Sequence, residues 1–445
     1  MSSSTKSTVN AHYLDHVMTV AEERQVEATE DIYAENGMKL IAKGYAINRS
    51  MRERLIAHKL IKPLEDCMAV SDGVTGARCA DLAEQLMDSH AVLRAMCTSA
   101  NGVNPVKLLR DSTFAGRLQT LLTVYTEHQA GKLAHAVSVC MLTLNLAQRV
   151  LPGDADALDV LLVAALSHDV GELYIDPVYL QSQASLGPKA WRHIAAHPVI
   201  AHGLLKELNG LARPASALIL DHHERLDGFG YPHGRRAGEV SEQAQTLAVA
   251  EMLAGMLDKG GGMLQQADIA VKLIHGEFSR PMIDAVSGLF KACKVADAVA
   301  ESDTLIGVLA GARALGQRLQ CILRVQDNYW PLFERASPPF KVQWHQARAR
   351  FESILRAWSS TGLDVQPDGA WLQQEPLALQ REVAIIIKEI NWRLGELERE
   401  LHARVTRHAA GDLPILERYF KDVRQAADDL AALSTSGEGE IRDSP

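Results

Sequence analysis

The stretch LDVLLVAALSHD (Leu158–Asp169) decides how the central part of this chain folds and where its chemistry lies. It is apolar almost all round before its last residues, which is typical of a helix buried in a protein core. It ends in a histidine and an aspartate, His168 and Asp169, and burying these two polar side chains is costly unless they have a partner. A metal ion is the simplest partner, so the stretch predicts a buried helix that ends at a metal site.

More histidines accompany helical segments on both sides of this stretch. Imidazole and carboxylate ligands together suit Fe, Mn or Zn, and the absence of a cysteine ligand argues against a structural zinc site. One carboxylate among several imidazoles can bridge two cations, which together activate water and hold the oxygens of a phosphodiester. We therefore predict a centre of two divalent metal ions, with Fe or Mn favoured. The ligand positions in this ordered series are His135, His168, Asp169, His197, His222 and His223.

Three segments of this region resemble the HD-GYP family of metal-dependent phosphodiesterases. They are HDVGE (His168–Glu172), His197-Pro198 and HHERLDGFGYP (His222–Pro232), of which the last is the most specific. The resemblance covers about residues 125–293. The family is all-helical and hydrolyses cyclic di-GMP to the linear dinucleotide pGpG, or onward to GMP. The resemblance therefore implies a phosphodiesterase of bacterial second-messenger signalling, with cyclic di-GMP as its substrate.

The resemblance also implies a role for single residues. Asp169 would bridge the two metals. Each metal would also be held by a further set of ligands of its own. The first set is His135, His168 and Glu251, and the second is His197, His222 and His223. A loop would shape the site and approach the substrate, and its glycines would allow a tight backbone course that a proline stiffens at its end. The residues of this loop are Arg225, Asp227, Gly228, Gly230, Tyr231 and Pro232.

Four features differ from the family pattern. Glu172 stands where the family has a lysine that meets a substrate phosphate. It is expected at the catalytic centre with Asp169, where its carboxylate repels the anion or binds a metal instead. Glu251 replaces an aspartate, and Gly131 replaces a glutamate that supplies a third metal in some members. The Arg-Pro-Tyr-Arg stretch of the family is absent after Ala254.

These differences leave alternatives to cyclic di-GMP hydrolysis open. Loss of a cationic contact in a dry site lowers transition-state stabilisation, while the metal ligands are complete apart from one conservative exchange. The first alternative is a catalytically weakened receptor that binds metal and cyclic di-GMP and signals through its C-terminal helices. The second is hydrolysis of another phosphoester.

The segments outside the metal region predict a mainly α protein with one small β module. Apolar alternation around Asn36-Gly37 predicts a hairpin, and Met51–Ile61 predicts a short helix that Asn48 or Ser50 caps. The long charged helix expected at Pro376–Val405 favours a bundle, or self-association or a protein partner.

The predicted domain division has five parts. They are a β-hairpin/helix module at 1–65, a helical connector at 66–124, a helical HD-type metal-dependent hydrolase domain at 125–293, a C-terminal helical bundle at 294–432 and a disordered tail at 433–445.

Composition narrows the expected partners and location. A net charge of -9 leaves no basic surplus for a nucleic-acid polymer. The amino terminus lacks the apolar segment of a signal peptide, and no apolar stretch is long enough to predict a membrane span. The six cysteines are scattered without a CxxC pair, as expected of reduced thiols. These features predict a cytoplasmic protein.

Overall fold

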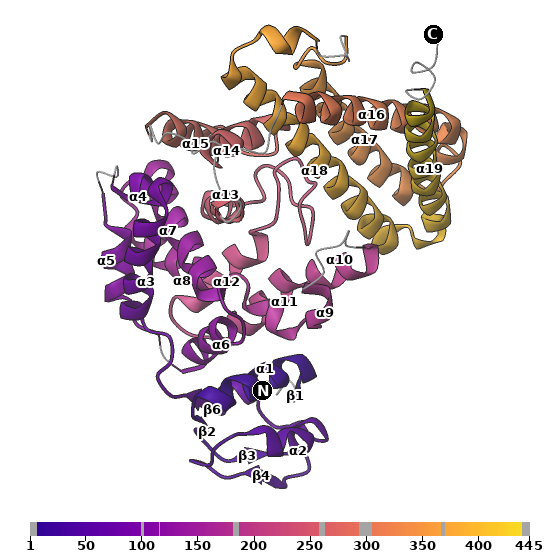
Figure 1. Cartoon of the computed structure of the whole chain (residues 1–445). Coiled ribbons are helices and arrows are strands. Elements are labelled where there is room, and N and C mark those ends of the chain that lie inside the picture. Colours follow the sequence, from indigo (N-terminus) through magenta and orange to yellow (C-terminus); the bar gives the residue numbers. More distant parts are fainter. Residues whose placement is uncertain are drawn as a thin grey trace, which may run out of the picture. The chain divides into compact units, whose positions relative to one another are not determined.

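The computed structural model describes residues 7–98, 102–114, 116–180, 187–257, 263–292, 305–365 and 370–437. The chain divides into two compact units, which are described separately. The first consists of Met1–Lys259 and Phe278–Ala296, and the second of Gly260–Glu277 and Asp297–Pro445. The described part of the chain is mainly helical with a few short strands near its start (Figure 1), which confirms the predicted fold class.

The first unit begins with a small module of short strands and helices. Its strands form three antiparallel pairs, β1 with β5, β2 with β6 and β3 with β4. The predicted hairpin is confirmed as the β3–β4 pair, and in its turn Gly37 has a φ of 82°, which glycine adopts without strain. The elements are β1 (Ser7–Thr8), α1 (Ala11–Glu23), β2 (Val26–Ala28), β3 (Ile32–Tyr33), β4 (Lys39–Ile41), η1 (Arg49–Met51), α2 (Arg52–Ile56), β5 (Lys59–Leu60), η2 (Leu64–Asp66) and β6 (Met68–Val70).

Two features of this module differ from the prediction. The helix expected over Met51–Ile61 ends at Ile56, because the backbone that follows pairs with β1 as strand β5. Asn48 caps the 3-10 turn η1 instead, where its side chain accepts a hydrogen bond from the Ser50 amide at 3.1 Å, and α2 itself begins without a side-chain cap. Helix α1 is missing from the sequence-based prediction, although it buries Tyr13 and Val17, and the Tyr13 ring stacks on that of Tyr174 with centroids 4.9 Å apart.

The remaining helices of the first unit gather around α7, which is buried along most of its length. Helix α7 contacts α8, α13, α3 and α15. The apolar helix predicted before His168 is confirmed as α8. The helices are α3 (Gly76–Ser89), α4 (Ala91–Thr98), α5 (Pro105–Asp111), α6 (Gly116–Glu127), α7 (Lys132–Val150), α8 (Ala155–Ser167), η3 (Val170–Tyr174), α9 (Pro177–Leu180), α10 (Pro188–Ile194), α11 (His197–Leu205), α12 (Ala212–Asp221), α13 (Glu242–Leu257) and α15 (Arg280–Ala292).

No single described helix is long and apolar enough to cross a membrane. Helices α6 and α7 meet the length and composition requirements only as a pair, and the pair is bent by 117°.

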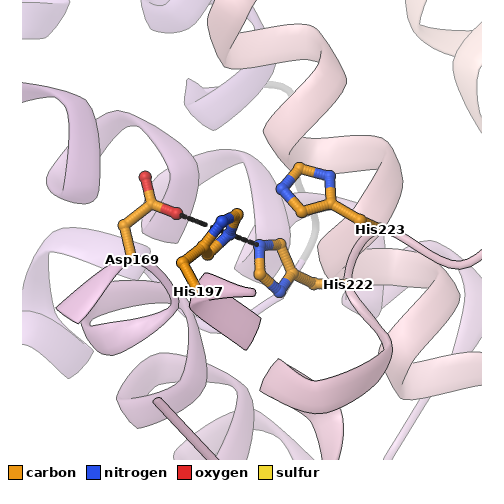
Figure 2. A group of neighbouring side chains, drawn as sticks. All are labelled: Asp169, His197, His222 and His223. Carbon is orange, nitrogen blue, oxygen red and sulfur yellow. Dashed lines mark hydrogen bonds and ion pairs between the residues drawn. The ribbon is translucent and has the colours of Figure 1, made fainter. Parts of the chain in front are cut away.

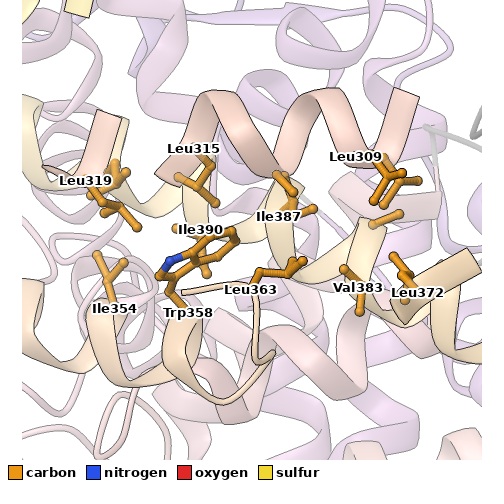
Figure 3. Packing of buried hydrophobic residues seen from close by; sticks show 14 of the residues in the cluster. Leu309, Leu315, Leu319, Ile354, Trp358, Leu363, Leu372, Val383, Ile387 and Ile390 are labelled. Atoms are coloured by element: carbon orange, nitrogen blue, oxygen red, sulfur yellow. The ribbon is translucent and has the colours of Figure 1, made fainter. Parts of the chain in front are cut away.

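The second unit consists of long helices that pack on one another. Its core includes Leu315, Ile354, Trp358, Ile387 and Ile390, whose side chains meet between neighbouring helices (Figure 3). The long helix predicted from Pro376 is confirmed as α18. The elements are α14 (Met263–Leu273), α16 (Leu305–Phe333), α17 (Pro338–Ser359), η4 (Ala370–Gln374), α18 (Leu377–His408), η5 (Ala410–Asp412) and α19 (Leu413–Gly437).

The two units do not coincide with the predicted five-part division, which stays a prediction. Helix α14 falls inside the predicted hydrolase domain, yet it packs on α18 in the second unit. Helix α19 continues to Gly437, so it enters the segment predicted as a tail from residue 433. Residues 438–445 of that predicted tail lie outside the described residues.

A buried ion-pair network joins the segment that follows α14 to α17 and α18. Glu277 has no exposed surface, and its Oε1 lies 2.6 Å from Arg393 Nη1 and 3.3 Å from Arg350 Nη2. Arg350 also lies 2.9 Å from Glu396. Removing one charge from such a network leaves another buried without its partner, which is far more costly than breaking an exposed pair.

We therefore expect Glu277→Gln to destabilise the second unit by about 3–5 kcal/mol. The measurement is the thermal unfolding transition of the full chain, followed by circular dichroism or calorimetry. Glu352→Gln is the matched control, because Glu352 forms an exposed pair with Arg348 in the same unit and its loss should cost about 0–1 kcal/mol. Equal transitions for the two variants would contradict this account of the network.

Candidate metal centre

The predicted ligands come together from the ends of several helices. His135 lies in the first turn of α7, and Glu251 lies on α13. His168 and Asp169 directly follow α8, His197 begins α11, and the adjacent pair of histidines directly follows α12. The structure places all seven predicted ligands in two neighbouring donor groups. One is His135, His168 and Glu251, and the other is Asp169, His197, His222 and His223.

Asp169 lies between the two groups. Its Oδ2 is 3.2 Å from His168 Nε2 and 3.9 Å from His135 Nε2. Its Oδ1 is 3.3 Å from His197 Nε2 and 3.9 Å from His222 Nε2. Figure 2 shows the carboxylate directed at the histidines of the second group. Each carboxylate oxygen therefore faces one group, which is the geometry that a bridging ligand requires.

Helix-end carbonyls fix the orientation of three of the imidazoles. Nδ1 of His168 lies 2.8 Å from the carbonyl of Ala165, and Nδ1 of His197 lies 2.8 Å from that of Ile194. Nδ1 of His222 makes the same contact with a carbonyl of α12 at 2.5 Å. A carbonyl only accepts, so Nδ1 carries the hydrogen and Nε2 of the neutral ring keeps its lone pair. This is the second contact by which metal-binding histidines are commonly oriented.

The positions of the ring nitrogens of His197 and His222 indicate whether a metal ion fits in the second group. Their Nε2 atoms lie 3.2 Å apart, and in the neutral rings neither has a hydrogen to donate to the other. Two lone pairs that face each other in a buried site repel unless a cation lies between or beside them. In the first group, His168 Nε2 and Glu251 Oε2 lie 3.2 Å apart, and with the His168 hydrogen on Nδ1 no hydrogen bond joins these two buried atoms. The donor set therefore fits cations at both groups.

The electrostatics of the two groups differ. Burial, helped by the neighbouring His197 and His168, lowers the pKa of His222 to about 3. Burial and His222 likewise lower the pKa of His223 well below its usual range, so both rings are neutral, as metal ligands must be. Burial also lowers the pKa of His168, but the carboxylates of Asp169 and Glu251 outweigh it and raise that pKa. The first group thus carries a negative potential that a cation relieves.

Glu172 is paired with a lysine that sequence reasoning missed. Its carboxylate forms a close ion pair with Lys132, the first residue of α7, and it belongs to neither donor group of the described residues. The ammonium also lies 5.3 Å from the centre of the Tyr125 ring, whose hydroxyl donates to Asp169 Oδ2 at 3.3 Å. Lys132 precedes His135 by three residues, a helical spacing that places both near the site and could have indicated it.

The loop after α12 is held by a buried glutamate. The Glu224 carboxylate accepts hydrogen bonds from the backbone amides of His233, Gly234 and Arg235 at 2.7–3.1 Å. Arg235 also pairs with Asp221 at 2.7 Å. Asp221, Glu224 and His233 form a third set of potential metal donors, but the Glu224 oxygens are already engaged by the backbone. The glutamate therefore acts as a structural anchor of the loop.

The six predicted substrate-loop residues belong to the loop after α12, and one of them, Tyr231, lies beside the second donor group. The Tyr231 ring stacks on His223 with centroids 4.6 Å apart, and a cis peptide bond joins it to Pro232. Asp227 accepts a hydrogen bond from the Phe229 amide at 2.9 Å, and Gly228 has a φ of 78°. Arg225 is buried, with its guanidinium 5.3 Å from the Phe278 ring centre. Their contact with a substrate stays a prediction.

Two glycines permit close approaches of the backbone around this centre. A Cβ on Gly171 would lie 2.1 Å from the carbonyl oxygen of His197, and one on Gly230 would lie 2.3 Å from the amide nitrogen of Arg225. Both contacts are with backbone atoms, which cannot rotate away. Gly171 therefore allows η3 and α11 to meet closely enough for Asp169 and His197 to face each other.

The comparisons with known proteins agree with this geometry. Residues 119–284 match a family model described as an HD domain. The chain is 28% identical over 233 residues to a 3'3'-cGAMP-specific phosphodiesterase of Vibrio cholerae, covering 47% of this chain and 49% of that protein. It is 31% identical over 122 residues to a cyclic di-GMP phosphodiesterase of Pseudomonas aeruginosa, covering 26% of this chain and 28% of that protein. The chain thus spans about half or less of the length of these relatives.

A solved structure is also similar. It is described as a HDG"Y"P protein from Bdellovibrio bacteriovorus, with 15% identity, a TM-score of 0.32, and coverage of 60% of this chain and 95% of that chain.

We expect Gly171→Ala to disrupt the centre. The added Cβ must push α11 away from η3, which costs about 1–3 kcal/mol and moves His197 out of reach of a shared cation. The metal content of the purified protein and its unfolding temperature should both fall. Gly203→Ala, on the same helix α11 with nothing within 4 Å of the added Cβ, is the control and should retain both. A Gly171→Ala variant with the metal content of the parent would show that this close approach is not required.

Proposed function

We propose that the HD domain formed by residues 119–284 is a metal-dependent phosphodiesterase of the HD-GYP type, which hydrolyses cyclic di-GMP to pGpG or onward to GMP. The observation that supports this best is the position of Asp169. Each of its two carboxylate oxygens faces a separate group of buried nitrogen and oxygen donors. Such an arrangement suits two divalent metal ions, and its imidazole-rich donors favour Fe or Mn.

Bound divalent cations would supply Lewis acidity, an activated water and positive charge for the phosphodiester oxygens. The chain's own residues orient the metal ligands and exclude water from the site. The helix-end carbonyls hold His168, His197 and His222 with their lone pairs inward. His168 and His222 have no exposed surface, and the exclusion of water around them strengthens every charge interaction at the site.

The substrate class follows from the relatives. One relative is named for 3'3'-cGAMP and another for cyclic di-GMP, so both act on cyclic dinucleotides. The aromatic Tyr231, stacked on His223 and in edge contact with Trp191 at 5.1 Å, lies where a purine base could stack beside the metal centre. These features support a cyclic dinucleotide over a linear phosphoester.

Lys132 supplies a cation beside a site in which Glu172 adds a negative charge. Because the two side chains form an ion pair, the Glu172 carboxylate is neutralised and does not face an incoming phosphate alone. The Lys132 ammonium is tied to the metal centre through the Tyr125 ring and its hydrogen bond to Asp169. In this arrangement Glu172 positions the lysine, and the lysine meets the substrate anion. The pairing therefore favours turnover over the receptor alternative.

The first experiment follows product formation. Protein purified without oxygen and loaded with Fe or Mn is incubated with cyclic di-GMP, and pGpG and GMP are separated by chromatography. We expect product from the parent and a loss of at least about 1,000-fold in Asp169→Asn, because the bridge between the cations is weakened. Release of product only from 3'3'-cGAMP would reassign the substrate. Tight binding of both nucleotides without any product would support the receptor alternative instead.

The second experiment exchanges the charges of Lys132 and Glu172. Lys132→Gln should lower kcat/KM by roughly 10- to 150-fold, the usual value of a hydrogen bond to a charged group. Glu172→Lys places two ammonium groups together and should also lose activity. The double variant Lys132→Glu with Glu172→Lys restores the ion pair and should recover activity above either single variant. If the two effects simply add in a double-mutant cycle, the pair does not act as a unit.

A further inference from the structure

The last residue of η3, Tyr174, is held by three side chains of the N-terminal module, the strands and helices from β1 to β6 (residues 7–70). Its hydroxyl donates a hydrogen bond to Glu65 Oε1 at 2.9 Å, and its ring stacks on that of Tyr13 with centroids 4.9 Å apart. Its backbone carbonyl accepts a hydrogen bond from the Asn10 side chain at 3.2 Å. The module therefore binds the ring, the hydroxyl and the carbonyl of one residue.

The three module side chains are themselves fixed. Asn10 Oδ1 caps α1, because it accepts hydrogen bonds from the amides of His12 and Tyr13 at 2.9 and 3.1 Å. Tyr13 is only 1% exposed. The buried Glu65 carboxylate also lies 3.3 Å from Arg117 of α6. A buried network of this kind, whose members already have partners, is rigid, so it can hold a tyrosine in one position.

The backbone of η3 connects Tyr174 to the metal centre. Asp169 directly precedes η3, and its carbonyl accepts a hydrogen bond from the Glu172 amide at 2.9 Å. The Glu172 carbonyl in turn accepts one from the Ile175 amide at 2.9 Å. Gly171 of the same segment meets the backbone of α11 closely. Because η3 contacts both the module and α11, a shift at Tyr174 must move Asp169 as well.

We propose that Tyr174 is a positioning residue through which the N-terminal module sets the place of Asp169 between the two donor groups. The proposal rests on the proposed two-metal centre. Metal–ligand distances are fixed within about 0.2 Å, so a small shift of η3 lengthens the contact of a bridging carboxylate with one of its two cations. The module then forms part of the metal centre, and its displacement weakens the binding of metal.

Two variants loosen this contact while they keep the ring and the cap of α1. Tyr174→Phe removes the hydroxyl and keeps the stack on Tyr13. Asn10→Asp keeps the oxygen that caps α1 and removes the amide that donates to Tyr174. Tyr33→Phe is the matched control, because the Tyr33 hydroxyl also donates to a carboxylate of the module, that of Asp31 at 3.2 Å, and takes no part in holding Tyr174.

A second pair of variants isolates the acceptor of the Tyr174 hydroxyl. Glu65→Gln keeps an oxygen that can accept this hydrogen bond, whereas Glu65→Leu removes it. Both variants lose the negative charge that faces Arg117, so that loss is the same in the two. We expect Glu65→Gln to bind metal as the parent does and Glu65→Leu to behave like Tyr174→Phe.

The first readout is the binding of Mn²⁺ alone to the metal-free full chain, followed by electron paramagnetic resonance. The signal of the free ion gives the stoichiometry and affinity, and a spin-coupled signal reports two Mn²⁺ ions that share a bridging ligand. We expect the parent and Tyr33→Phe to bind two Mn²⁺ ions with a coupled signal. Tyr174→Phe and Asn10→Asp should bind the second ion roughly 3- to 10-fold more weakly, as expected for the loss of one hydrogen bond, and should lose part of the coupled signal.

The second readout is hydrogen–deuterium exchange of the metal-free chain, measured by mass spectrometry. A peptide that contains the Glu172 and Ile175 amides should exchange faster in Tyr174→Phe and Asn10→Asp than in the parent, because η3 is held less firmly. Peptides from the middle of α7 should exchange as in the parent. This pattern separates a local loosening of η3 from a general loss of stability.

The possible failures can be told apart. A parent that binds fewer than two Mn²⁺ ions would overturn the two-metal centre and the positioning role with it. A parent that binds two, together with unchanged affinity and coupling in Tyr174→Phe and Asn10→Asp, would overturn the positioning role alone. Equal weakening by Tyr33→Phe, or by Glu65→Gln and Glu65→Leu, would also overturn it, because the effect would then not depend on the contacts of Tyr174.

Discussion

The Asp169 carboxylate is the group on which the rest of the site depends. It is a buried anion among imidazoles, and its two oxygens face two different sets of donors. A buried charge is stable only when it is paired, and here the pairing is shared between both sets. The end of α8, the start of α11 and the first turn of α7 must therefore meet at one point. The close approach of η3 to α11 at Gly171 and the packing of helices around α7 bring these helix ends together.

Helix ends supply the orientation that metal chemistry needs. The last carbonyls of a helix lack partners inside it, and three histidines satisfy such carbonyls through Nδ1. This contact turns Nε2 toward the centre and, in the neutral ring, leaves it without a hydrogen. A side chain also satisfies backbone groups in the loop after α12, where the Glu224 carboxylate accepts hydrogen bonds from three backbone amides. The side chains that give these backbone groups their hydrogen-bond partners therefore also set the geometry of the site and of the loop beside it.

Much of this could be predicted from the sequence, because the signals are local. The apolar run before His168 identifies the buried helix α8, and Asn36-Gly37 identifies the β3–β4 hairpin. The spacing of Lys132 and His135 could have indicated a lysine near the site, but not its pairing with Glu172, which joins two segments 40 residues apart. The strand β5 could not be foreseen either, because pairing with β1 overrides the local helical pattern of its residues. Long-range pairing decides such cases, and no local pattern records it.

The most direct test of the central claim is to locate the metals themselves. Crystals of the Fe- or Mn-loaded protein would be measured at the absorption edge of the metal, and the anomalous difference map would be inspected around Asp169. The account predicts two peaks on opposite sides of this carboxylate, one beside His135, His168 and Glu251 and one beside His197, His222 and His223. A single peak, or peaks that do not contact Asp169, would contradict it.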